Sequence, residues 1–103
     1  MSLIPKSFEL GGCTYTVEIT DIKPEGTRDS TTGTIIYPIN KIMIYSNHTG
    51  YICTDNYKES SFYHEMVHGI LATMGKSDLN DDEDFVEGFA NILHQVIKTS
   101  KYE

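Results

Sequence analysis

The sequence predicts a small α+β domain, in which a β-rich first half packs against two helices formed by the second half. Three observations lead to this prediction. Before residue 46, short runs of alternating or β-branched residues are separated by Gly, Pro and Asn, which is typical of strands and turns. From Lys58 onward, apolar residues recur every three or four positions, as on one face of a helix. The length of 103 residues allows one core, so residues 1–103 are expected to form a single domain.

The strands are expected to form a small, mostly antiparallel sheet. Residues 8–19 alternate on both sides of a Gly-Gly dipeptide, which favours a hairpin turn. Residues 21–33 are rich in Pro, Gly, Asp, Ser and Thr and are predicted to form a loop. Two further runs, residues 34–37 and 42–45, are β-branched and aromatic, which indicates two more short strands.

The two expected helices are separated by a short turn. The first begins near Lys58 and stops at Gly75, a residue that often ends helices. Its apolar stripe at helical spacing comprises Phe62, Met66, Ile70 and Met74. The second begins near the acidic residues 81–84, which suit the positive end of a helix dipole. Its expected buried stripe comprises Phe85, Phe89, Leu93 and Val96.

Charge and composition restrict the partners of the chain. A net charge of −7 without a Lys/Arg cluster argues against a nucleic-acid partner. No apolar stretch is long enough to span a membrane, and residues 1–6 lack the apolar run of a signal peptide. Cys13 and Cys53 form no CxxC pair, so we expect two free thiols in a cytoplasmic protein.

The pentapeptide His64-Glu65-Met66-Val67-His68 is an HExxH pattern within the first expected helix. One helical turn separates the two histidines, so both imidazoles leave the same face and can meet at one metal ion. Glu65 projects from a neighbouring angle, within reach of a metal-bound water. Zinc lowers the pKa of bound water and a carboxylate then takes its proton, so the pattern predicts a Zn²⁺ hydrolase site with Glu65 as general base.

A catalytic zinc site takes a third protein ligand, and the second expected helix offers two carboxylates on one face. Either Glu83 or Glu87 is expected to bind zinc, while the other hydrogen-bonds a ligand histidine. A calcium loop beginning at Asp78 is excluded, because Glu83 stands where Gly is needed and Phe89 where Glu is needed.

The HExxH pattern followed by Glu83-Asp84-Phe85-Val86-Glu87-Gly88-Phe89-Ala90 resembles zincin metallopeptidases of the gluzincin type. The resemblance is strongest to small proteins related to the ImmA/IrrE group and to short phage-encoded or prophage-encoded metallopeptidases. In these, HExxH is followed by a helix carrying E-x-x-x-(D/N/E)-x-F-A, whose first Glu is the third zinc ligand. This chain carries Glu rather than Asp or Asn at position 87, and its spacing from His68 to Glu83 is short.

This resemblance covers roughly residues 34 to 97 and implies a minimal zincin-like domain. It implies that zinc is held by His64, His68 and Glu83, with Glu87 beside a ligand histidine. It also implies that the strand before the metal helix, residues 42–45, is an edge strand that pairs with an extended substrate. The alternative for these residues is an ordinary strand of the sheet.

The function predicted from these residues is a zinc-dependent metallopeptidase that hydrolyses a peptide or protein substrate. Two alternatives stay open. In the first, the chain is a catalytically inactive, zinc-stabilised binding or regulatory module of phage or prophage origin. In the second, it is a metal-free structural protein in which HExxH arose by chance.

Overall fold

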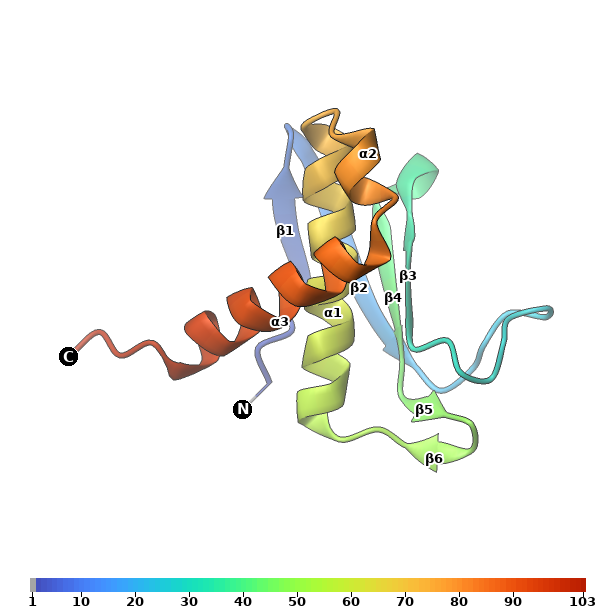
Figure 1. The fold of residues 1–103 in the computed structure, drawn as a ribbon. Coiled ribbons are helices and arrows are strands. Elements are labelled where there is room, and N and C mark those ends of the chain that lie inside the picture. Colours follow the sequence, from blue (N-terminus) through green and yellow to red (C-terminus); the bar gives the residue numbers. More distant parts are fainter. Residues whose placement is uncertain (1) are drawn as a thin grey trace.

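The computed structural model describes residues 2–103 and contains a four-stranded sheet, two long helices and a short helix between them (Figure 1). The strands follow the order β1-β2-β4-β3 across the sheet. Their bounds are β1 Ser7–Leu10, β2 Cys13–Thr20, β3 Gly33–Ile36 and β4 Lys41–Tyr45. The pairs β1–β2 and β3–β4 are antiparallel, whereas β2–β4 is parallel. The predicted α+β class is confirmed, and the sheet is mixed.

Tight connections join the antiparallel pairs. Gly11 and Gly12, between β1 and β2, have φ angles of 59° and 81°, the left-handed conformation that a two-residue hairpin turn of this kind requires. A 3₁₀ turn, η1 (Tyr37–Ile39), joins β3 to β4 and ends at Asn40, which is also left-handed. Both turns follow the Gly and Asn positions that separate the apolar runs of the sequence.

Strand β4 is an internal strand, because β2 pairs with one side of it and β3 with the other. The expectation that residues 42–45 form an edge strand is therefore wrong. Ile42 and Ile44 are 0% exposed, so their apolar run reflects a central strand covered by a helix. Strand β3 lies at the edge of the sheet, with backbone groups on its outer side that no other strand of the sheet occupies.

Helix α1 (Asp55–Thr73) lies between the sheet and the last helix (Figure 1). Phe62 meets Phe8 of β1 edge to face, whereas the neighbouring Tyr63 stacks on His94 of the last helix. Because α1 is covered on two sides, its buried residues do not form a single stripe. Met74, expected in the buried stripe, lies just beyond the helix and is exposed.

Helix α3 (Glu83–Thr99) follows the short helix α2 (Ser77–Asn80), and the Asp82 carboxylate caps it by accepting a hydrogen bond from the Phe85 N–H. The helix crosses α1 on the side away from the sheet (Figure 1). The helix itself was predicted, and its start at the acidic residues is confirmed.

The predicted buried stripe of α3 is wrong in part. Phe85 and Leu93 are partly buried, but Phe89 and Val96 are 51% and 55% exposed. The residues of α3 that are fully buried against α1 share another face and are Val86, Ala90 and His94. The partner decides this face, because α1 offers the carboxylate of Glu59 to His94, and Val86 and Ala90 join the core to which α1 contributes Tyr63.

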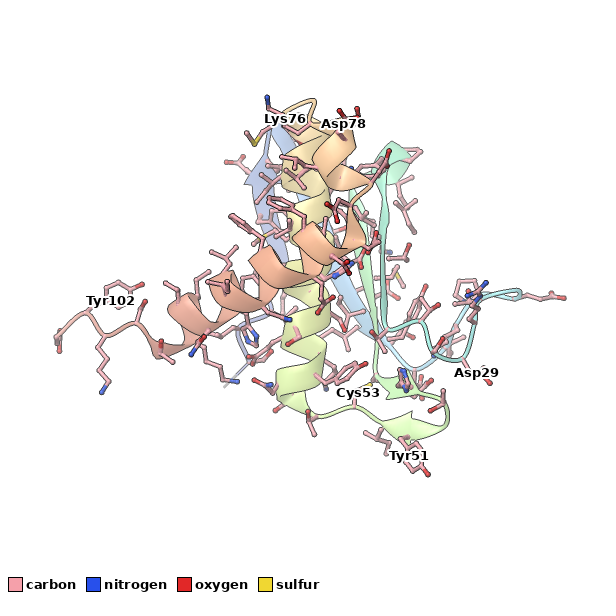
Figure 2. The ribbon with its side chains drawn as sticks, viewed as in Figure 1. Asp29, Tyr51, Cys53, Lys76, Asp78 and Tyr102 are labelled. Carbon is pink, nitrogen blue, oxygen red and sulfur yellow. The ribbon has the colours of Figure 1, made fainter. Side chains whose placement is uncertain are left out.

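A two-stranded hairpin, β5 (Asn47–His48) with β6 (Tyr51–Ile52), leads into α1. Figure 2 shows Tyr51 projecting outward from this hairpin, and both residues of β6 are exposed. Cys13 and Cys53 are both free thiols. Within residues 2–103, every helix is too short or too polar to cross a membrane.

Candidate metal centre

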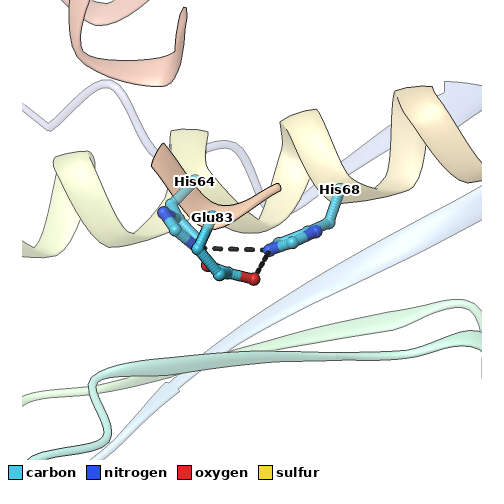
Figure 3. Close-up of side chains that lie close together, drawn as sticks. All are labelled: His64, His68 and Glu83. Atoms are coloured by element: carbon cyan, nitrogen blue, oxygen red, sulfur yellow. Dashed lines mark hydrogen bonds and ion pairs between the residues drawn. The ribbon is translucent and has the colours of Figure 1, made fainter. Parts of the chain in front are cut away.

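Helix α1 places the imidazoles of His64 and His68 side by side, with their Nε2 atoms 3.2 Å apart (Figure 3). Glu83, the first residue of α3, meets them from the other helix. One of its carboxylate oxygens lies 3.2 Å from Nε2 of His64, and the other lies 3.2 Å from Nε2 of His68. The three side chains offer ligand atoms that all lie within 4.8 Å of one another. The structure thus brings together three of the residues singled out in the sequence.

The outer nitrogens of both imidazoles are bound by acceptors. Nδ1 of His64 lies 2.7 Å from the Glu87 carboxylate, and Nδ1 of His68 lies 2.6 Å from Oδ1 of Asn80. A carboxylate and an amide oxygen accept hydrogen bonds, so each Nδ1 carries a proton and donates it. Glu87 therefore lies where it orients His64, at the opposite side of the ring from Glu83.

This arrangement fits a zinc ion. With each Nδ1 protonated, a neutral imidazole presents a lone pair at Nε2, and here two such lone pairs and a carboxylate converge on one point. A cation placed between these three groups would be attracted by each of them. Two ligand atoms bound to one tetrahedral zinc lie about 3.3 Å apart, which is close to the 3.2 Å between these Nε2 atoms. Imidazole and carboxylate are also ligands that zinc prefers.

Glu65 lies half-buried beside this cluster, with Gly33 of β3 next to it. A Cβ atom at Gly33 would come within 3.2 Å of the Glu65 side chain, so the edge strand and this carboxylate are in close contact. Burial raises the pKa of the Glu65 carboxyl; the two histidines oppose this shift, and Glu83 and Glu87 reinforce it. A carboxylate with a raised pKa is a stronger base toward water.

Two polar residues near the cluster were not assigned a role from the sequence. Asn80 lies at the end of the four-residue helix α2, where no periodicity marks it. Ser60 lies one helical turn before His64, so its spacing places it on the histidine face of α1. His48 hydrogen-bonds its neighbour Thr49 in the β5–β6 hairpin and lies outside the cluster.

Comparison of the chain with protein families, with characterised proteins and with solved structures finds no match.

Proposed function

We propose that this chain is a zinc-dependent metallopeptidase that holds zinc through His64, His68 and Glu83. The convergence of these three side chains, each imidazole oriented from behind by Glu87 or Asn80, is the observation that supports the proposal best. Catalytic zinc sites use three protein ligands and keep a further position open. We also propose a cytoplasmic location, which the free thiols of Cys13 and Cys53 support.

In this proposal the residues of the chain divide the work of hydrolysis. Bound zinc would acidify water and polarise a peptide carbonyl. Glu65 accepts a proton from water as the water oxygen bonds to the carbonyl carbon, and it then donates this proton to the amine as the C–N bond breaks. Glu87 and Asn80 hold the two imidazoles in one orientation and one tautomer throughout.

The edge strand β3 offers a binding site for an extended substrate peptide. Its Gly33 lies against Glu65, so an extended peptide paired with the outer side of β3 would pass directly beside the general base. Main-chain hydrogen bonds to an edge strand bind peptides without regard to their side chains. The substrate strand is thus expected on β3, in place of residues 42–45.

The second candidate function is a zinc-stabilised binding module without peptidase activity. The apolar residues exposed on α3 favour it, because Phe89, Ile92 and Val96 lie together on a face that α1 leaves uncovered. Such a face is typical of a protein-interaction surface.

Substitution of the general base separates the two candidates. We expect Glu65→Gln to retain zinc and to lower the rate of peptide-library cleavage by at least about 100-fold, because the amide cannot accept the proton. Mass spectrometry of the peptides and elemental analysis of the purified protein measure the two effects. A wild-type protein that binds zinc but cleaves no peptide would support the binding module.

Zinc content gives the matched control. His68→Ala should lose zinc, whereas His48→Ala, the same change in the hairpin, should retain it, because His48 lies outside the cluster. Equal zinc content in both variants would mean that the histidines of α1 do not hold the metal.

A further inference from the structure

A groove of about 450 Å³ adjoins the metal cluster and extends along the N-terminal half of α1. The loop before β3 and Gly33 form one wall, and Asn91 and Glu87 of α3 form the other. Tyr57 and Ser60 of α1 lie between these walls. Its volume lies in the range of ordinary ligand pockets, so it is large enough for a long amino-acid side chain.

Ser60 is oriented by a buried chain of hydrogen bonds. Its hydroxyl lies 3.4 Å from Nδ1 of His94, and Nε2 of the same ring lies 2.9 Å from the carboxylate of Glu59. Glu59 also accepts a hydrogen bond from Lys98 at 3.0 Å, so the lysine already supplies the positive charge that balances this carboxylate. Nε2 of His94 carries a proton and donates it to Glu59, because a carboxylate only accepts.

Ser60 keeps acceptor capacity toward a ligand whichever way its hydrogen bond with His94 runs. A hydroxyl has two lone pairs and one proton, and His94 Nδ1 contacts it at a single position. At least one lone pair of Ser60 Oγ is therefore free to accept a hydrogen bond from a group in the groove.

The charges of the groove point the same way. Glu65 and Glu87 line it beside His64, and none of the described lining residues is Lys or Arg. Bound zinc would add positive charge at the His64 end, so the part of the groove that favours a cation is the part at Glu87, Ser60 and Asn91. The whole chain has a net charge of −7, so no distant excess of positive charge offsets the local field. Carboxylates in a partly enclosed groove attract cations more strongly than carboxylates on an open surface.

We propose that this groove binds a lysine or arginine side chain of the peptide substrate, next to the scissile bond. The assignment rests on the proposed peptidase function for the scissile bond, and on the acceptor-lined groove for the side chain. Both cationic side chains bring only donors, and they match Ser60 Oγ and the carboxylate of Glu87. A leucine would leave these acceptors without partners, and a glutamate would be repelled by them.

The test measures binding separately from cleavage. Short blocked peptides, alike except for one central Arg, Lys, Leu or Glu, are titrated into the zinc-loaded Glu65→Gln protein at about 0.15 M salt, which weakens attraction to the distant charges of the chain. Glutamine keeps the shape of the groove and an acceptor oxygen but removes the charge of Glu65, so the preference measured in this variant depends on Glu87 and Ser60. We expect the Arg and Lys peptides to bind about tenfold more tightly than the Leu peptide, with the Glu peptide weakest.

A matched pair of substitutions on α3 shows whether the groove is responsible. Asn91→Lys adds a positive charge to the groove wall, whereas Gln95→Lys adds the same charge one helical turn away, on an exposed residue outside the lining. In the Glu65→Gln background, Asn91→Lys should weaken binding of the Arg peptide about tenfold, and Gln95→Lys less than about twofold. Ser60→Ala should weaken the Arg peptide and leave the Leu peptide unchanged.

Each outcome bears on one proposal or the other. Equal effects of Asn91→Lys and Gln95→Lys, tighter binding of the Leu peptide, or no measurable binding of the Arg and Lys peptides would overturn the assignment of the groove. If wild-type protein cleaves peptides without preference for Lys or Arg, the peptidase stands and the groove assignment fails. If the Glu65→Gln protein binds with the expected preference while wild type cleaves nothing, the groove assignment stands and the peptidase fails.

Discussion

At the scale of single residues, the orientation of each imidazole matters as much as its position. His64 and His68 leave α1 on one face by helical geometry alone, but each ring could still rotate about its χ2 bond. The Glu87 carboxylate and Oδ1 of Asn80 restrict this rotation by accepting the two Nδ1 protons. Both Nε2 atoms consequently point toward Glu83, as a metal ligand set requires.

This role of Asn80 leads to a prediction for zinc affinity. Asn80→Ala removes the acceptor of His68 and should weaken zinc binding by about 10- to 100-fold, which competition with a chromophoric chelator measures. Ser77→Ala, a neutral change in the same short helix, is the control and should leave the affinity unchanged. An Asn80→Ala protein with wild-type affinity would show that Asn80 does not orient His68.

At the scale of elements, Gly69, the residue after His68, limits how closely α1 packs on the sheet. A Cβ atom at Gly69 would lie 3.0 Å from Ile35 of β3 and 3.2 Å from Leu10 of β1. The helix therefore lies close to the sheet at Gly69, next to His68. Glycine at this position allows the two layers to approach, and it costs the helix some intrinsic stability.

We expect Gly69→Val to lower the free energy of unfolding by about 1–3 kcal/mol, because the larger side chain is forced against the sheet. Gly88→Val provides the comparison, since a Cβ at Gly88 in α3 meets open space, and it should change stability by less than about 0.5 kcal/mol. Urea unfolding followed by circular dichroism measures both. Equal destabilisation of the two variants would mean that helix propensity, and not the contact with the sheet, dominates.

At the scale of the whole molecule, Glu59 connects three parts of the chain that are distant in sequence. This carboxylate is 1% exposed and accepts hydrogen bonds from the Leu3 N–H, from His94 and from Lys98. Burial alone would raise the pKa of Glu59, but these three donors outweigh it and lower the pKa below the ordinary value of 4.5. The Glu59 carboxylate of α1 thereby links the N-terminal segment and α3 through hydrogen bonds.

The lowered pKa of Glu59 predicts the acid sensitivity of the fold. On acidification the unfolded chain takes up this proton first, so the stabilisation is present above pH 4.5 and is lost as the pH falls through the lower folded-state value. The free energy of unfolding of wild type should therefore fall more steeply below pH 4.5 than that of Glu59→Gln, as denaturant titrations at several pH values would show. Glu25→Gln, an exposed change in the loop, should keep the wild-type slope.

Local patterns predicted much of the fold, and non-local packing accounts for the errors. The hairpin at Gly11 and Gly12, the two helices and the HExxH face each depend on neighbours within a few residues, which the sequence displays directly. The order of strands in the sheet depends on distant residues, because β2 pairs with β4 although β3 lies between them in the sequence. The apolar residues of α3 likewise indicated a helix, but α1 determined which of them are buried.

The sequence by itself determined that His64 and His68 share a face of one helix with Glu65 beside them, because helical periodicity is local. Only the tertiary structure decided between Glu83 and Glu87 for the position facing both histidines. They lie on one face of α3, and the crossing of α3 over α1 places Glu83 against both Nε2 atoms and Glu87 behind His64. The same crossing forms the groove with its acceptors, since its walls come from segments that only folding brings together.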